Sequence, residues 1–227
     1  MKNIEAVIFD LEGTLLNCPR LSDEYLNATI NLIARRKRIL PVETRRVLFS
    51  TRARLAERLG YEPTMVDTVA ALGISREDFY QCIESVDPHR YVEPYPLLTK
   101  ALAKFKQECK IGLLTNVSRQ TAARILLALG IDHNQFDAIV AGDEVSHIKP
   151  AKEPFLKLAG LLQAQLEKSV MVGDRIYIDL IPAKELGMMT VLLGRIGCST
   201  DLVDFIAPDI LSVYNLLFVM KHPTTNS

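Results

Sequence analysis

Five short apolar runs recur along the chain, and amphipathic stretches separate them. The runs are nearly continuous and rich in Val, Ile and Leu, which is typical of strands buried on both faces. Their alternation with helical patterns predicts a parallel sheet covered by helices. The predicted strands are AVIFD (6–10), KIGLLT (110–115), DAIVAG (137–142), SVMVGD (169–174) and MTVLLG (189–194).

Apolar residues at helical spacing predict helices between these runs. In residues 119–130, Ala122, Ile125 and Leu129 fall on one face, and Gly130 is suited to end the helix. Similar patterns predict helices over 153–166, 179–186 and 211–220.

A long insertion separates the first predicted strand from the second. It spans about ninety residues, whereas a crossover between parallel strands needs only about a dozen or more. The insertion contains no convincing strand pattern, so we expect a separate helical domain over residues 18–92 and a core formed by 1–17 and 93–227. Its helical patterns span 22–38, 43–59, 64–72 and 75–85, the last with Ser75 as N-cap.

Composition limits the classes of protein to consider. The 227 residues are 48% hydrophobic, enough for a substantial core, and the formal net charge of zero argues against a general nucleic-acid binder. No apolar stretch approaches the ~20 residues of a membrane helix, and Asp10 comes too early for the apolar segment of a signal peptide. We therefore expect a soluble cytoplasmic protein that binds neither nucleic acid nor membrane.

Charge is unevenly distributed along the chain. Residues 35–58 contain nine Lys or Arg residues and two Glu, so the remainder is acidic. Solvated helix faces explain most charge runs of this kind. The alternative is a basic lobe that draws in an anionic substrate, and the sequence leaves both interpretations open.

The cysteines are far apart and form no Cys-x-x-Cys pair, so neither a disulfide framework nor a zinc site is predicted. A reducing compartment is the simplest interpretation. The four positions are Cys18, Cys82, Cys109 and Cys198.

Polar residues follow the predicted strands at the point where each ends. Ligands of open parallel sheets bind beyond the carboxyl ends of the strands, so we expect these side chains to meet at one edge of the sheet. They are Asp10 and Glu12 at the end of the first run, Thr115 and Asn116 at the end of the second, Lys149 in the loop after the third, and Asp174 and Asp179 at and beyond the end of the fourth.

These residue types favour phosphoryl chemistry. Clustered carboxylates repel one another unless a cation joins them, and an all-oxygen site with few protein ligands suits Mg²⁺, which also accepts phosphate oxygens. Asp10 would attack phosphorus to form an aspartyl-phosphate that water then hydrolyses. Lys149 and Thr115 would hold the transferring oxygens.

Taken singly, most of these residues also have a structural explanation. Asp10 and Glu12 could belong to a turn in which a side chain caps the next helix, a common use of Asp. Asp174 and Asp179 could be the N-cap and a first-turn residue of a helix, and Thr115 suits a strand. Lys149 on its own would be an ordinary surface lysine. The functional interpretation therefore depends on all of them occurring together.

In order and spacing, these motifs resemble the four motifs of the haloacid dehalogenase-like hydrolases. The matching segments are Asp-Leu-Glu-Gly-Thr-Leu at 10–15, Leu-Leu-Thr-Asn at 113–116, Lys149-Pro150 followed by Phe155, and Gly-Asp-x-x-x-x-Asp at 173–179. The resemblance implies an α/β fold: a Rossmann-like parallel sheet core with an inserted α-helical cap domain. It also implies a Mg²⁺-dependent phosphatase acting on a small phosphorylated metabolite, as a monomer or homodimer.

The resemblance further implies roles for the site residues. Asp10 would be the nucleophile and Glu12 the acid/base, with Lys149 as the third catalytic residue. Asp10, Asp174 and the backbone carbonyl of Glu12 would bind Mg²⁺. The phosphate would contact Thr115, Asn116 and Lys149, and Asp179 would hold the metal shell or Lys149 in place.

Glu12 departs from the family pattern, because the phosphatases usually carry Asp there. The extra methylene moves the carboxyl group outward by roughly 1 Å, a displacement that already affects rates by ~10²-fold. The backbone carbonyl does not depend on the side chain, so metal binding should survive. Two alternatives stay open: a catalytically impaired binding or regulatory protein, and a phosphosugar mutase.

Overall fold

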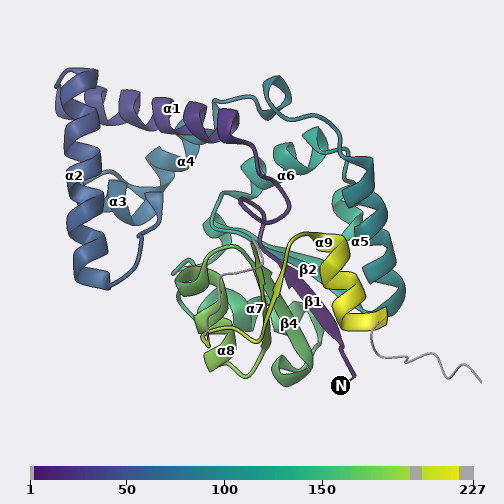
Figure 1. Cartoon of the computed structure of the whole chain (residues 1–227). Helices are drawn as coiled ribbons and strands as arrows, with labels where there is room; N and C mark the ends of the chain where they lie inside the picture. Colours follow the sequence, from purple (N-terminus) through teal and green to yellow (C-terminus); the bar gives the residue numbers. More distant parts are fainter. Residues whose placement is uncertain (1–2, 195–200, 220–227) are drawn as a thin grey trace, which may run out of the picture. The chain divides into compact units, whose positions relative to one another are not determined.

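The chain divides into two compact units, one formed by Met1–Asn17 with Glu93–Ser227 and the other by Cys18–Val92 (Figure 1). The computed structural model describes residues 3–194 and 201–219. Cys198 and the last residue of the predicted helix 211–220 lie outside the described residues. Cys18, Cys82 and Cys109 are free thiols. In the described part of the chain, no helix has the length and apolar character needed to span a bilayer.

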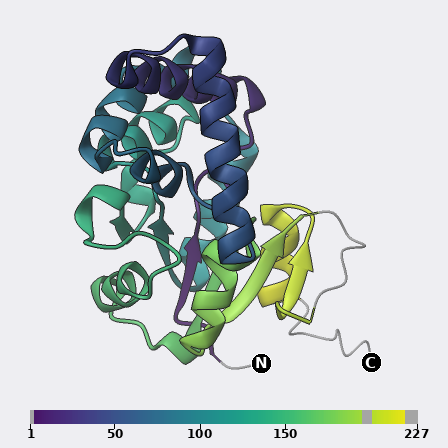
Figure 2. The same cartoon turned by 90° about the vertical axis from the view of Figure 1, so that its left-hand side faces the viewer.

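Within the described residues of the first unit, six parallel strands form one sheet in the order β3-β2-β1-β4-β5-β6. Figure 2 shows β1 in purple, with the teal strands on one side and the green strands on the other. The strands are β1 (Ala6–Phe9), β2 (Lys110–Leu114), β3 (Ala138–Val140), β4 (Ser169–Gly173), β5 (Met189–Leu193) and β6 (Phe205–Ala207).

The five predicted strands are confirmed to within two residues at each end, and so is their parallel arrangement. β6 was not predicted, because its three residues at the edge of the sheet are too few to produce an apolar run.

The register places the ends of the central strands at one level. Phe9, the last residue of β1, pairs with Leu113 of β2 and with Val172 of β4. The residues that follow these three strands therefore emerge together at the carboxyl edge of the sheet.

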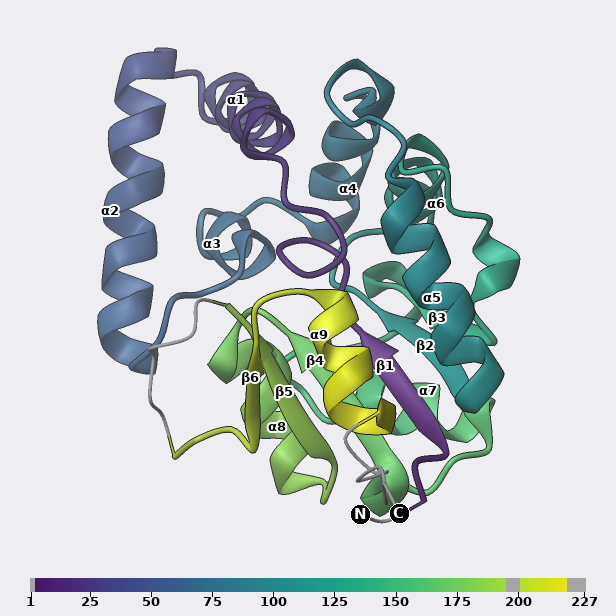
Figure 3. The ribbon, with the colours of Figure 1, turned by 45° about the vertical axis from the view of Figure 1, so that its right-hand side comes forward.

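Helices cover both faces of this sheet. On one face, Phe105 of α5 (Pro96–Glu108) makes edge contacts with Phe9 of β1 and with Tyr214 of α9 (Ile210–Tyr214), at centroid distances of 5.1 and 5.3 Å. Figure 3 shows α5 and α9 in front of the strands. On the other face, Ile8 and Met171 share a core with α7 (Glu153–Leu162) and α8 (Ile181–Glu185).

The predicted helices of this unit are confirmed, with changes at their ends. Residues 119–130 form α6 (Arg119–Ala128), and residues 153–166 form α7, which stops earlier than predicted. A π-helical turn, Ile176–Leu180, precedes α8, and a second one, Asn215–Val219, follows α9. Short 3₁₀ helices complete the described connections of this unit at His133–Gln135, Gly142–Glu144 and Leu166–Lys168.

α5 was not predicted, although its sequence carries the appropriate signals. Leu98, Leu102 and Phe105 are buried at helical spacing, and Pro96 occupies the first turn, where proline is favoured.

The second unit is α-helical in its described residues. Its four α-helices are α1 (Pro19–Lys37), α2 (Pro41–Leu59), α3 (Met65–Ala71) and α4 (Arg76–Glu84), each within three residues of a predicted helix, and a 3₁₀ helix follows at Pro88–Arg90. Ile33, Leu48 and Val69 form part of their common core. The Ser75 N-cap is confirmed, because its hydroxyl accepts a hydrogen bond from the backbone N–H of Asp78 at 3.0 Å.

The two ends of this unit lie side by side. The Sγ atom of Cys18 donates a hydrogen bond to the carbonyl oxygen of Tyr91 at 3.4 Å. The chain therefore enters and leaves the second unit at nearly the same point.

Candidate active site

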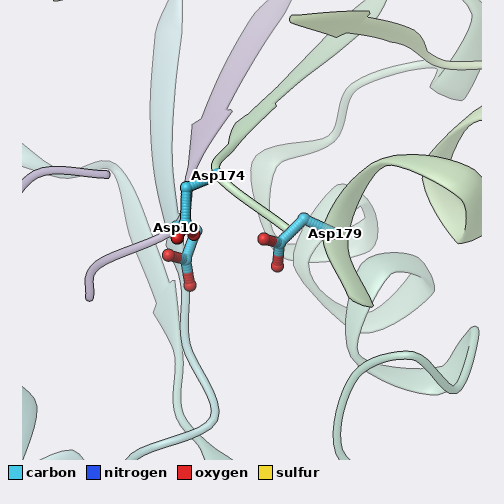
Figure 4. A group of neighbouring side chains, drawn as sticks. All are labelled: Asp10, Asp174 and Asp179. Atoms are coloured by element: carbon cyan, nitrogen blue, oxygen red, sulfur yellow. The ribbon is translucent and has the colours of Figure 1, made fainter. Parts of the chain in front are cut away.

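Three aspartates meet at the carboxyl edge of the sheet (Figure 4). Asp10 directly follows β1, Asp174 directly follows β4, and Asp179 lies in the π-helical turn after it. One carboxylate oxygen from each lies within 4.8 Å of the others. Pairing of β1 with β4 explains this proximity of residues far apart in sequence.

Lys149 joins this group from the loop after β3 and is buried. Its ammonium group donates hydrogen bonds to Oδ1 of Asp10 at 2.6 Å, to Oδ1 of Asp179 at 2.7 Å and to the carbonyl oxygen of Leu114 at 2.8 Å. These contacts use all three of its donors. Lys149 is therefore an internal counter-charge and not a surface lysine.

The charges explain why this lysine stays protonated. Burial lowers the pKa of Lys149, but the adjacent carboxylates of Asp10 and Asp179 outweigh burial and raise that pKa above its ordinary value. Burial has the opposite effect on Asp10, whose pKa it raises, and the charges of Asp179 and Asp174 add to this increase against the lowering effect of Lys149. The single ammonium group of Lys149 therefore does not balance the negative charges of the three carboxylates, Asp10, Asp174 and Asp179.

Asp174 differs from the other two aspartates in its hydrogen bonding. Its buried Oδ1 atom has no hydrogen-bond partner among the described residues. Burial, followed by the charge of Asp179, raises the pKa of Asp174 to about 6. A buried acceptor without a donor is costly, and a divalent cation coordinated by oxygen would satisfy it.

Asp179, by contrast, has protein partners for both oxygens. Oδ1 accepts from Lys149, and Oδ2 accepts from the backbone N–H of Arg175 at 3.1 Å. Asp179 also packs against the end of β4, because a Cβ atom on Gly173 would lie 2.6 Å from the Cβ atom of Asp179. This arrangement suits a supporting residue better than a metal ligand.

Glu12 lies two residues beyond Asp10, in the turn that follows β1. Surrounding protein atoms and the negative charge of Asp174 raise the pKa of Glu12 to about 7. The side chain of Glu12 is nevertheless exposed to solvent. Solvent weakens the effect of the surrounding protein atoms on this pKa, so repulsion by Asp174 is the better supported of the two causes. A raised carboxyl pKa suits a general acid.

Gly13 allows this turn to pass close to Asp174. Its φ of +91° lies in the left-handed region, which favours glycine. A Cβ atom on Gly13 would lie 2.2 Å from Oδ2 of Asp174. Any side chain here would therefore displace the carboxylate that carries the unpartnered oxygen.

Thr115 and Asn116 follow β2, on the other side of β1. Thr115 is buried, and its hydroxyl accepts a hydrogen bond from the backbone N–H of Val117 at 3.3 Å. The carboxamide of Asn116 contacts the backbone of Lys149 through its oxygen and its nitrogen, both at 2.9 Å. Both polar atoms of this carboxamide are thus engaged with the backbone of Lys149. A contact between Asn116 and phosphate stays a prediction.

Sequence reasoning missed Glu153, which holds the loop that leads to Lys149. Its carboxylate accepts hydrogen bonds from the backbone N–H groups of Ser146 at 2.8 Å and His147 at 3.0 Å. An acidic residue in the first turn of the predicted helix 153–166 was the available signal. That signal indicates a capping role but not which N–H groups the carboxylate contacts.

Comparison with known proteins gives a family match and several relatives similar in sequence. Residues 4–187 match the family model described as haloacid dehalogenase-like hydrolase. The chain is 29% identical over 200 residues to Pyrophosphatase PpaX of Bacillus mycoides, covering 84% of each. It is also 29% identical over 211 residues to Pyrophosphatase PpaX of Halalkalibacterium halodurans, covering 91% of each.

A solved structure of a related protein is also similar to this chain. The crystal structure of a HAD phosphatase from Thermococcus onnurineus aligns with 96% of this chain and 98% of its own, at 25% identity and a TM-score of 0.69. The seven predicted site residues, from Asp10 to Asp179, all fall within the matched residues 4–187.

Proposed function

Because this chain belongs to the haloacid dehalogenase-like hydrolases, we propose that it is a Mg²⁺-dependent phosphatase with Asp10 as nucleophile. It releases phosphate from a small phosphorylated metabolite through an aspartyl-phosphate. The observation that carries this proposal is the buried contact of Asp10 with Lys149 beside Asp174, at the edge of the sheet where ligands bind.

The hydrogen bonds of the three aspartates support separate roles for metal ligands and supporting residues. Asp10, Asp174 and the backbone carbonyl of Glu12 would hold Mg²⁺, whereas the oxygens of Asp179 are already engaged. When bound, Mg²⁺ neutralises the repulsion between the attacking carboxylate and the anionic phosphate. The raised pKa values of Asp10 and Asp174 are those expected of carboxylates that such a cation stabilises.

The remaining steps fall to the chain's own groups. Lys149 holds Oδ1 of Asp10, so the other oxygen is oriented to attack phosphorus while the bond to the leaving oxygen breaks. Glu12 gives its proton to that leaving oxygen. Its carboxylate then takes a proton from the water that hydrolyses the aspartyl-phosphate. Thr115 supports the transferring oxygens from the end of β2.

The direct test is phosphate release with Mg²⁺ and with chelator. The substrates are an aryl phosphate, a panel of phosphorylated metabolites, and inorganic pyrophosphate, which the name of the two curated relatives suggests. We expect turnover with Mg²⁺ that chelator removes. Equal traces of phosphate release under both conditions would favour the binding or regulatory protein, and isomerised phosphosugar without free phosphate would favour the mutase.

The role of Cys18–Val92 as a cap stays a prediction.

Glu12→Ala is expected to reduce kcat on alkyl phosphates by about 10²-fold or more. The loss on aryl phosphates should be smaller, because their better leaving group needs less protonation. Glu12→Gln, which keeps the size of the side chain, should behave like Glu12→Ala. Steady-state kinetics on matched alkyl and aryl phosphates measure the difference, and equal losses on both would refute the acid role.

Gly13→Ala is expected to weaken Mg²⁺ binding by about 10- to 100-fold, the range seen when a group that orients a metal ligand is changed. The added methyl group would displace Asp174. Calorimetric titration with Mg²⁺ measures the effect.

Gly60→Ala is the matched control for this substitution. Gly60 also has a positive φ, +76°, but a Cβ atom there would meet nothing within 4 Å. The control carries the same backbone strain and should keep wild-type affinity for Mg²⁺. Wild-type affinity in Gly13→Ala as well would show that Asp174 does not need this space.

A further inference from the structure

A single side chain binds both polar groups of the Lys149 backbone. Oδ1 of Asn116 accepts a hydrogen bond from the backbone N–H of Lys149 at 2.9 Å. Nδ2 of Asn116 donates to the backbone carbonyl of Lys149 at 2.9 Å. These two contacts, on either side of one Cα atom, fix both the position of that atom and the direction in which its side chain leaves the backbone.

Asn116 itself is held by the sheet. It follows Thr115, whose backbone N–H donates to the carbonyl of Val140 in β3 at 3.1 Å. One residue beyond Asn116, the carbonyl of Val117 accepts from the N–H of Gly142 at 2.8 Å. The carboxamide therefore ties the loop that carries Lys149 to the hydrogen-bonded carboxyl ends of β2 and β3.

The lysine needs this support because its side chain is long and has three acceptors to meet. Its Nζ atom lies 2.6 to 2.8 Å from Asp10, Asp179 and the carbonyl of Leu114. A displacement of about 1 Å at the Cα atom would lengthen at least one of these contacts and misplace the nucleophile, and misplacements of that size cost about 10²-fold in rate. Glu153 holds the same loop earlier, at Ser146 and His147.

We propose that Asn116 is a positioning residue, which aims the ammonium group of Lys149 at Asp10 and so orients the nucleophile. This inference rests on the proposed function, because its effect on rate passes through Lys149 and Asp10. It differs from the phosphate contact predicted from the sequence. Loss of a phosphate contact weakens substrate binding and raises KM, whereas loss of positioning lowers kcat and leaves KM nearly unchanged.

The first experiment compares Asn116→Ala with wild type in the Mg²⁺-dependent assay. We expect kcat to fall by about 10- to 100-fold and KM to change by less than about threefold. Asn116→Asp should also lose kcat, because its carboxylate still accepts from the N–H of Lys149 but faces the carbonyl with an oxygen. A rise in KM with unchanged kcat would overturn the proposal in favour of a phosphate contact.

Asn134→Ala is the matched control. Asn134 is an exposed residue before β3, near the opposite edge of the sheet. The same substitution there should leave kcat and KM unchanged. Melting temperatures are measured for both variants. A loss of kcat in Asn116→Ala that matches the loss of folded protein would indicate a purely structural role and overturn the proposal.

A double-mutant cycle tests whether Asn116 acts through Lys149. In a Lys149→Ala background, Asn116→Ala should cause no further loss of kcat, because there is no ammonium group left to aim. Lys149→Arg replaces Lys149→Ala if the latter has no measurable turnover, and the second loss should then be smaller than in wild type. Losses that multiply in full would overturn the positioning role.

The outcomes also separate this inference from the proposed function. Turnover that survives chelator and an Asp10→Asn substitution would contradict the proposed function itself. Turnover that both treatments abolish, but that is unchanged in Asn116→Ala, would contradict only the positioning role.

Discussion

An Asp10→Asn variant is expected to lose Mg²⁺-dependent phosphate release by on the order of 10⁴-fold or more, the scale seen when a covalent nucleophile is removed. A carboxamide has nearly the same shape as the carboxylate but is a far weaker nucleophile. Lys149 keeps Asp179 and the carbonyl of Leu114 as partners, so the fold should survive the change.

The measurement combines turnover with acid-quenched trapping of phosphate on the protein. Wild type should carry acid-stable labelled phosphate during turnover, and Asp10→Asn should carry none. Asp201→Asn, the same change at an exposed position, should behave as wild type in both. Turnover within about tenfold of wild type in Asp10→Asn would show that water attacks phosphorus without an aspartyl-phosphate.

The largest effect on stability is expected for Lys149→Met. Removing one partner of a buried ion pair leaves an uncompensated charge and typically costs about 3 to 5 kcal/mol of unfolding free energy. Here two buried carboxylates, Asp10 and Asp179, lose the same cation. Denaturant unfolding with chelator present measures the loss.

The loss should depend on pH in a definite direction. Lys149 lowers the pKa of Asp10, so its removal raises that pKa further above the ordinary 3.8. The folded variant then keeps a proton that the unfolded chain releases. Its unfolding free energy therefore rises as the pH falls from about 8 toward the ordinary carboxyl range. The difference between wild type and variant should be larger at about pH 8 than at about pH 6.

Lys152→Met provides the control three residues away. Lys152 forms an ion pair with Glu185 at 3.0 Å, but both side chains are about half exposed. Exposed pairs contribute about 0 to 1 kcal/mol, so this variant should lose little stability and show no matching pH dependence. Similar losses in the two variants would contradict the role of Lys149 as an internal counter-charge.

The meeting of Asp10 and Asp174 could be predicted because it depends on regular structure. Each follows a short apolar run, and parallel strands in register bring the residues after them to one edge. Asp179 was included because Gly-Asp-x-x-x-x-Asp at 173–179 resembles the fourth motif of the family. The helices of the second unit were predictable because apolar residues at helical spacing indicate which face of each helix is buried.

Other features could not be predicted from the sequence, because they depend on tertiary packing. The pairing of Asn116 with the backbone of Lys149 joins two loops, and no local pattern encodes it. The close approach of Gly13 to Asp174 likewise depends on how the turn after β1 lies against β4. At position 12 the residue type was known from the sequence, but its exposure and the effect of Asp174 on its pKa were not.

The hydrogen bond between Cys18 and Tyr91 has a consequence for how proteins built this way diversify. A segment that begins and ends at nearly one point can be exchanged for another folded module without rerouting the polypeptide on either side. The strands that carry the acids are then free to stay constant while the inserted module changes. An exchange at this junction would leave the order and register of the sheet strands unchanged.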